Sequence, residues 1–201
     1  MKAILMALAL GLLSVPALAT HADDSATRLV QRTADQMLDA LKHRRGELER
    51  NPQLINQLVD NILAPHFDFE MITRAAVGRD WNKASPAQQR ALTSAFREML
   101  IRTYSKALLK YSDEDIVYES SRPGTHSDTV VVSTQVRAPG SSPIPMDYRL
   151  HKKSGSWKVY DVIIENVSLI SNYRGQFRAT IARSGIDGLI DELETKNARG
   201  A

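Results

Sequence analysis

The sequence predicts an α+β fold in which amphipathic helices pack on one face of an antiparallel sheet of about four strands. Three observations support this prediction. Apolar residues in the first half of the chain recur every three or four positions, which is helical spacing. From about residue 115 to 164 the period becomes two, which is typical of strands with one apolar face. After Asn166 the helical spacing returns.

The first residues have the pattern of a secretory signal peptide. Lys2 supplies a positive charge, residues 3–13 form a short apolar run, and Pro16 precedes a small-residue cleavage pattern. Cleavage after Ala19 and cleavage after Ala22 both fit this pattern. The apolar run is too short to span a bilayer comfortably. We therefore predict that residues 1–22 are a cleaved signal peptide and that residues 23–201 form a single domain.

Composition narrows the class of protein further. The chain has no Cys, so an exported domain must be stable without disulfides, which fits a bacterial periplasm. It carries 26 Lys and Arg against 23 Asp and Glu, a formal net charge of +3. No concentrated basic patch with interleaved aromatic residues appears, which argues against nucleic acid as a partner. We therefore expect a soluble periplasmic protein.

Three helices are predicted before residue 80. The first covers 26–49 with one apolar stripe, which is the pattern of an amphipathic helix. The second starts at Pro52, since proline suits a first helical turn, and ends before Pro65. A third, short helix carries residues 71–76 and is capped by Gly78.

The fourth helix is the best specified in the chain. Ser85 is an N-cap residue, Pro86 takes the first helical position, and Gln88 completes a capping box. Apolar residues then follow at helical intervals to about residue 111. The sequence therefore predicts one helix of about 25 residues here.

Four strands of an antiparallel meander follow this helix. Alternation places them near 115–119, 130–137, 144–151 and 156–165, with turn residues between them. One face of this sheet is apolar, so the helices must cover it. A final amphipathic helix follows, with a break near Ser184-Gly185.

The joint between the last strand and the helix after it is the most informative stretch. Simple alternation places Tyr160, Val162 and Ile164 on one face, and it places Trp157, Asp161 and Glu165 on the other. Such a joint can wall a hydrophobic cavity, or it can be an ordinary corner of a packed core. Periodicity alone leaves both interpretations open.

No pattern in the sequence indicates catalysis. There is no Cys nucleophile, no Gly-x-Ser-x-Gly elbow and no phosphate-binding glycine loop. None of the five His residues has the spacing of a metal site, and His66 is interpreted as a loop histidine that bonds local backbone. Asp161 and Glu165 could act as an acid and a base. However, Arg137 and Arg149 lie on the same predicted face, so cross-strand ion pairs are the simpler interpretation.

Several motifs, taken in order, resemble one known family. They are Phe67-Asp68-Phe69, Gly78-Arg79-x-Trp81, Asp147-Tyr148-Arg149-Leu150, the stretch 157–177 and Gly185-Ile186-Asp187-Gly188-Leu189-Ile190. Each is weak alone, but their order and spacing resemble the MlaC family, also called the toluene-tolerance auxiliary family. The resemblance covers essentially all of the predicted mature chain.

This resemblance implies a curved sheet with a hydrophobic cavity between sheet and helices. It implies no catalysis and no cofactor, with bound phospholipid as cargo. The implied role is a periplasmic carrier that shuttles phospholipid between an outer-membrane lipoprotein–porin complex and an inner-membrane ABC transporter complex with its membrane-anchored substrate-binding subunit. Such transport maintains outer-membrane lipid asymmetry. The alternative is a periplasmic adaptor or chaperone that has a filled core and acts through surface contacts.

Candidate lipid-binding residues follow from the predicted apolar sheet face, the long helix and the strand–helix joint. They are Leu100, Tyr104, Val130, Val132, Met146, Tyr148, Tyr160, Val162, Ile164, Val167, Ile170 and Tyr173. Ordinary core packing is the competing interpretation for each of them. Arg149, Lys152 and Lys158 are candidates for contact with anionic headgroups or partners, against the simpler alternative of a solvated surface.

Overall fold

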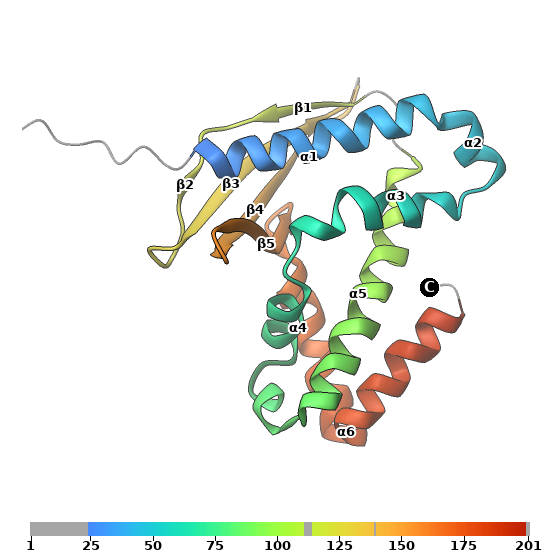
Figure 1. Ribbon diagram of the computed structural model, residues 1–201, viewed down its shortest axis with the longest axis vertical. Helices are drawn as coiled ribbons and strands as arrows, with labels where there is room; N and C mark the ends of the chain where they lie inside the picture. The colour runs from blue at the N-terminus through green and yellow to red at the C-terminus, as the bar shows by residue number, and fades with distance from the viewer. Residues whose placement is uncertain (1–23, 111–113, 139, 200–201) are drawn as a thin grey trace, which may run out of the picture.

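The computed structural model describes residues 24–110, 114–138 and 140–199. The predicted signal peptide, residues 1–22, lies outside these described residues. Figure 1 shows α1 crossing the sheet at one end of the molecule, with α4, α5 and α6 gathered at the other end and α3 between α1 and α5. The fold is α+β, as the change of period predicted.

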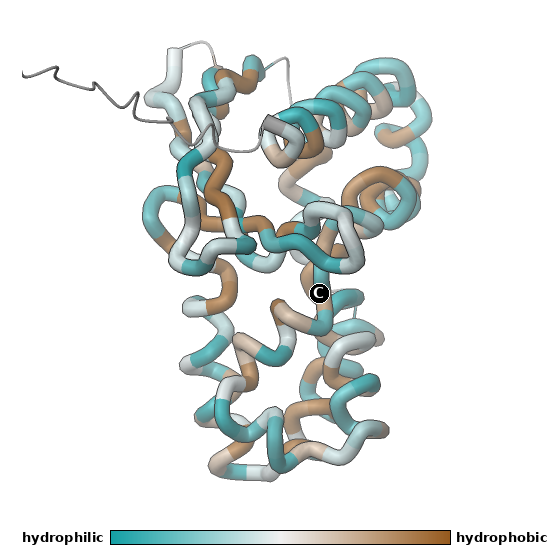
Figure 2. Tube along the Cα trace, turned by 60° about the vertical axis from the view of Figure 1, so that its left-hand side comes forward, coloured by the Kyte–Doolittle hydropathy of each residue, from teal (hydrophilic) through white to brown (hydrophobic). Residues whose placement is uncertain are grey.

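Helices fill the first half of the chain and its end. They are α1 (Asp24–His43), α2 (Arg45–Arg50), α3 (Leu54–Ile62), the 3-10 helix η1 (Ala64–His66), α4 (Phe69–Val77), the 3-10 helix η2 (Gly78–Lys83), α5 (Pro86–Leu108) and α6 (Leu169–Ala198). Figure 2 shows hydrophobic and hydrophilic residues interspersed along them, as expected of amphipathic helices. The predicted helix 26–49 is divided at Arg44 into α1 and α2.

The start of α5 has the predicted capping box. Ser85 Oγ accepts a hydrogen bond from the Gln88 N–H at 3.2 Å, and Gln88 Oε1 accepts one from the Ser85 N–H at 2.9 Å. Pro86 occupies the first helical turn. Gly78 caps α4 with a φ of 70°, as predicted. These local signals were readable because each depends only on residues close in sequence.

The described strands form one antiparallel sheet. They are β1 (Asp115–Tyr118), β2 (Arg122–Pro123), β3 (Thr129–Arg137), β4 (Ile144–Lys153), β5 (Ser156–Ile164) and β6 (Val167–Ser168). The order is β1-β3-β4-β5-β6, with β2 also paired to β3. The described sheet therefore has six strands instead of about four, because the two-residue strands β2 and β6 are too short to show alternation.

A β-bulge in β5 changes which side chains share a face. Arg149 of β4 pairs with Asp161, but the next residue, Leu150, pairs with Val159, so Tyr160 is an extra residue in β5. Trp157 and Val159 therefore lie on the same face as Val162. The prediction that Tyr160 shares a face with Val162 and Ile164 is wrong, because simple alternation does not allow for the extra residue.

Helix α1 covers the face of the sheet that carries Val132 and Leu150, here called the inner face. A buried cluster joins the two elements: Ala26, Leu29, Val30, Val130, Val132, Leu150, Trp157 and Val159. Trp157 Nε1–H donates to Ser25 Oγ at 2.8 Å and so ties the start of α1 to β5. The prediction that Trp157 lies on the polar face with Asp161 is therefore also wrong.

A second core lies among α4, α5 and α6. Phe96 of α5 is fully buried, and its ring meets Tyr173 at 5.0 Å and Phe177 at 4.8 Å between centroids, both edge to face. Leu189 and Leu193, from the second half of α6, complete this core. The chain must therefore turn sharply within α6 to return to α5.

Gly185 makes that turn, with φ 73° and ψ −174°, a conformation open essentially to glycine alone. We expect Gly185→Ala to lower the free energy of unfolding by about 1–3 kcal/mol. The matched control is Gly175→Ala in the regular part of α6, where an added Cβ also meets open space. This control should raise stability by about 0.5–1 kcal/mol. Urea unfolding measures both, and changes of the same sign would contradict the explanation.

Candidate functional site

A partly open cavity of about 230 Å³ lies between α1 and the inner face of the sheet. Its lining is almost wholly apolar. The lining residues are Leu29, Val30, Thr33, Ala34, Met37, Leu38, Leu63, His66, Phe67, Leu108, Ile116, Val136, Met146, Tyr148 and Val159. An apolar hollow with few polar groups is the usual form of a small-molecule site.

Helix α1 supplies one wall of this cavity. Leu29, Thr33 and Met37 are spaced four residues apart, so they lie along one side of the helix and face the sheet. Ala34 and Leu38 extend the wall at the neighbouring positions. The side chain of Ala34 is small, so part of the cavity beside it stays open. A larger side chain at this position would fill that part of the cavity.

Two titratable side chains in the lining are electrically neutral near pH 7. The pKa of His66 is lowered by burial and by the positive charges of Lys158 and Arg32. Burial raises the pKa of the Tyr148 phenol. A neutral imidazole and a neutral phenol allow the cavity to take an apolar ligand without leaving a charge unsolvated.

The structure brings six of the twelve candidate residues together on the inner face. Met146 and Tyr148 line the cavity, and Val130 and Val132 lie in the buried cluster beside it. The other two are Val162, which pairs with Tyr148 and packs against the same cluster, and Ile164, which pairs with Met146.

The other six candidates lie elsewhere. Leu100 and Ile170 are buried in the helical core, and Tyr160 and Tyr173 pack against it. Tyr104 is 37% exposed and Val167 is 59% exposed. The helix that faces the inner side of the sheet is α1, whereas the prediction placed α5 and the start of α6 there.

The lining residues that the sequence did not propose as lipid-binding candidates come mainly from α1 and from the segment around η1. The stripe of α1 was visible, since Leu29, Thr33 and Met37 recur at helical spacing. Which amphipathic helix covers the sheet depends on tertiary packing, so the stripe alone could not assign it. His66 ends η1 and Phe67 follows it, and neither had a periodic signal because η1 is only three residues long.

Asp161 has a structural role at the strand–helix joint. It is 1% exposed and accepts hydrogen bonds from Ser168 Oγ at 2.7 Å and from the Ile170 N–H at 3.3 Å. The predicted cross-strand pair with Arg149 is present at 3.2 Å. Glu165 instead lies exposed in the turn before β6, with a φ of 49°. Asp161 and Glu165 therefore do not form the paired arrangement that acid–base catalysis would need.

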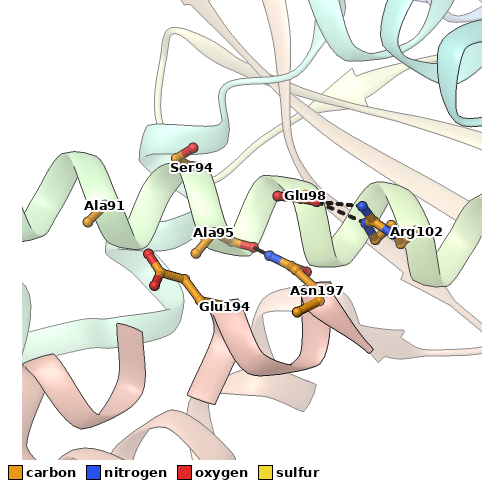
Figure 3. A pocket seen from close by; sticks show the side chains of 8 residues that line it. Ala91, Ser94, Ala95, Glu98, Arg102, Glu194 and Asn197 are labelled. Atoms are coloured by element: carbon orange, nitrogen blue, oxygen red, sulfur yellow. Dashed lines mark hydrogen bonds and ion pairs between the residues drawn. The ribbon is translucent and has the colours of Figure 1, made fainter. Parts of the chain in front are cut away.

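A second, open cleft of about 470 Å³ lies between α5 and the end of α6 (Figure 3). Its lining carries charge: Glu98 pairs with Arg102 at 2.8 Å, and Glu194 faces the same cleft. Asn197 Nδ2–H donates to the Ala95 carbonyl at 2.9 Å. Because hydrated charges are costly to cover with apolar groups, this cleft does not suit acyl chains.

The described residues contain neither a cluster of metal ligands nor a helix that could span a membrane. In ranges 24–110, 114–138 and 140–199, no group of three or more His, Asp or Glu side chains could hold a metal ion. Within the same ranges, each helix is too short or too polar to cross a membrane.

Comparisons with known proteins agree with this geometry. The family model described as "MlaC protein" matches residues 31–195. The chain is 26% identical over 176 residues to the intermembrane phospholipid transport system binding protein MlaC of Haemophilus influenzae, covering 86% of this chain and 82% of that protein. It is 27% identical over 177 residues to the toluene tolerance protein ttg2D of Pseudomonas putida, covering 88% of this chain and 82% of that protein.

A solved structure is also similar. It is the phospholipid-binding protein from Ralstonia solanacearum in complex with a phospholipid, which matches with a TM-score of 0.79 and 35% sequence identity. The match covers 89% of this chain and 99% of that one. Fold, motifs and family model therefore agree, and the chain belongs to the MlaC family.

Proposed function

We propose that this chain is a periplasmic phospholipid carrier and not an enzyme. The observation that carries this proposal is the apolar cavity between α1 and the inner face of the sheet. The similar protein from Ralstonia solanacearum was solved with a phospholipid bound, which supports the same class of ligand here.

The energetics explain why a carrier is needed. Two acyl chains of about 15 CH₂ groups each, at about 0.8 kcal/mol per group, cost on the order of 20 kcal/mol to expose to water. A free phospholipid therefore crosses an aqueous gap too slowly to be useful. A cavity lined by Leu, Val and Met side chains cancels most of this cost, since the bilayer and the protein interior are both apolar.

Loading requires the cavity to widen. At about 230 Å³ the hollow lies below the range of about 300–1,000 Å³ that is usual for ligands of drug size, and a phospholipid is larger still. Helix α1 contacts the inner face through apolar side chains, and the Trp157 indole N–H donates to Ser25 Oγ at the start of the helix. We therefore assign α1 as the wall that moves away from β3, β4 and β5 when lipid enters.

The carrier would exchange lipid with complexes in both membranes. On this proposal it docks in turn to an outer-membrane lipoprotein–porin complex and to an inner-membrane ABC transporter complex with its membrane-anchored substrate-binding subunit. Because the lipid is about equally stable in the bilayer and in the cavity, the docked partner decides when it leaves. A ligand shifts only those states that it binds differently.

Lipid extraction tests this proposal. Protein purified from cells without added lipid, then extracted with organic solvent, should yield phospholipid by mass spectrometry in an amount comparable to the protein. The same purification without the expressed chain is the blank. Phospholipid no more abundant than in the blank would contradict a carrier and would favour an adaptor that acts through its surface.

A further inference from the structure

The chain between η1 and α4 adds one extended residue to the edge of β5. Phe67 forms an isolated parallel bridge with Val159, and the Asp68 N–H donates to the Val159 carbonyl at 2.9 Å. Phe67 and Val159 both line the cavity. Because the Phe67 backbone is extended, with φ −103° and ψ 145°, the next side chain points to the opposite side of the sheet. Asp68 therefore lies on that opposite side, here called the outer face.

The carboxylate of Asp68 is bonded to β4 on the outer face. Its Oδ2 accepts a hydrogen bond from Lys153 Nζ at 2.9 Å and lies 3.1 Å from His151 Nε2. The Asp68 side chain is only 4% exposed. Burial alone would raise the pKa of Asp68, but the hydrogen bonds from Lys153 and from the Met71 N–H lower it below its ordinary value. An ionised carboxylate only accepts hydrogen bonds, so the His151 Nε2–H donates here.

Capping a helix does not by itself require this arrangement. Asp68 is the N-cap of α4, where its Oδ1 accepts from the Met71 N–H at 3.1 Å. Ser85 caps α5 in the same way with an exposed hydroxyl, and Ser and Asp are about equally good N-caps. A buried carboxylate is costly unless it is paired. The two bonds from Asp68 to β4 therefore need a second explanation.

Phe67 closes the edge of the cavity beside the middle of β5. The short strand β6 pairs only with Ile163 and Ile164, so it does not reach Val159. The Phe67 ring instead lies beside Val159 in the lining and stacks on Phe69, with 5.8 Å between ring centroids. A shift of this ring would open the cavity at the edge of the sheet.

We propose that Asp68 is a positioning residue for lipid retention: its bonds to His151 and Lys153 on the outer face hold the Phe67 ring in the cavity wall on the inner face. This inference rests on the proposed carrier function. Asp68 does not touch the lipid and acts only through Phe67. Its bonds keep this wall in place, so that α1 is the wall that moves. Without them the Phe67 segment separates more easily from β5, and the lipid leaves faster.

The rate of lipid release tests this role. Protein loaded with a phospholipid that carries pyrene on one acyl chain is mixed with an excess of unlabelled phosphatidylcholine vesicles, and the release rate constant is read by stopped-flow fluorescence. Asp68→Ser keeps an N-cap for α4 but is too short to reach β4. It should raise the rate constant about tenfold, since it removes hydrogen bonds to a charged group.

Gly185→Ala is the matched control for a loss of stability alone. Gly185 has a positive φ in α6 and does not line the cavity, so this variant is destabilised at a distance from the lipid. Its release rate should equal that of the wild type. An increase as large as that of Asp68→Ser would mean that general loosening releases the lipid, which would overturn the positioning role.

A double variant shows whether Asp68 acts through Phe67. Phe67→Ala should itself speed release, because it removes part of the wall. Adding Asp68→Ser to Phe67→Ala should then change the rate by less than about twofold, since no ring is left to position. Effects that multiply would show that Asp68 acts independently of Phe67 and would overturn the inference.

Lys153→Met provides a second route if Asp68→Ser does not fold. The Lys153 side chain is 47% exposed, so its loss is tolerated more easily, and release should be about threefold faster. Lys83→Met removes an ammonium that pairs with Asp80 at 2.6 Å in η2, and it should leave release unchanged. Wild-type release in Lys153→Met would overturn the positioning role.

The loading step separates this inference from the carrier function. Wild-type protein that takes up no labelled phospholipid would overturn the carrier function, and the positioning role with it. Wild-type protein that loads lipid, together with an Asp68→Ser protein that releases it at the wild-type rate, would overturn only the positioning role.

Discussion

Ala34→Trp is expected to give a folded protein that no longer carries phospholipid. Ala34 lies on α1 and lines the cavity, so the indole would occupy the space where acyl groups bind. Displacing only two CH₂ groups, at about 0.8 kcal/mol each, already lowers retention by about tenfold. Mass spectrometry of the organic extract, normalised to protein, measures this loss.

Ala179→Trp is the matched control. Ala179 is exposed on α6, far along the chain from the cavity wall, so the same substitution should leave the lipid content unchanged. Overpacking typically costs about 1–3 kcal/mol, so the stability of both variants is measured by urea unfolding. Full lipid content in a folded Ala34→Trp protein would show that lipid binds somewhere other than this cavity.

Asp161→Ala is expected to lower the free energy of unfolding by about 2–4 kcal/mol. The change removes the acceptor of the Ile170 N–H and of Ser168 Oγ, and it leaves Arg149 without its partner. The 1% exposure of Asp161 means that water cannot easily replace these bonds. The effect concentrates at the joint where β5 passes through β6 into α6.

Asp60→Ala provides the comparison, because Asp60 also pairs with an arginine, Arg97. The side chains of this pair are 42% exposed at Asp60 and 40% exposed at Arg97. The free energy of unfolding should therefore fall by only about 0–1 kcal/mol. Chemical denaturation measures both variants. Similar losses in the two would contradict a structural role for the buried carboxylate.

Local signals in the sequence predicted much of the fold. The capping box at Ser85 and Gln88, the cap at Gly78 and the break at Gly185 were all readable, because each depends on residues within one turn. The alternation of apolar and polar residues likewise located the strands β1, β3, β4 and β5. The bulge at Tyr160 was not readable, since simple alternation does not show where a strand carries one extra residue.

The cavity was harder to predict because several of the predicted helices had apolar stripes that could cover the sheet. The long helix with Leu100 and Tyr104 was the best specified, yet it packs against α6 and α4. Helix α1 instead lies over Val130 and Val132, and its residue Ser25 accepts a hydrogen bond from the Trp157 indole. That choice depends on contacts between residues more than 100 positions apart, which periodicity does not encode.

Photo-crosslinking tests most directly whether lipid occupies the cavity between α1 and the sheet. A phospholipid with a diazirine on one acyl chain is loaded into the protein and irradiated, and the labelled peptides are identified by mass spectrometry. Labels should fall on α1 residues 29–38 and on the inner face of β3 to β5, and they should disappear in Ala34→Trp. Labels confined to the cleft lined by Glu98, Arg102 and Glu194, or unaffected by Ala34→Trp, would contradict binding in this cavity.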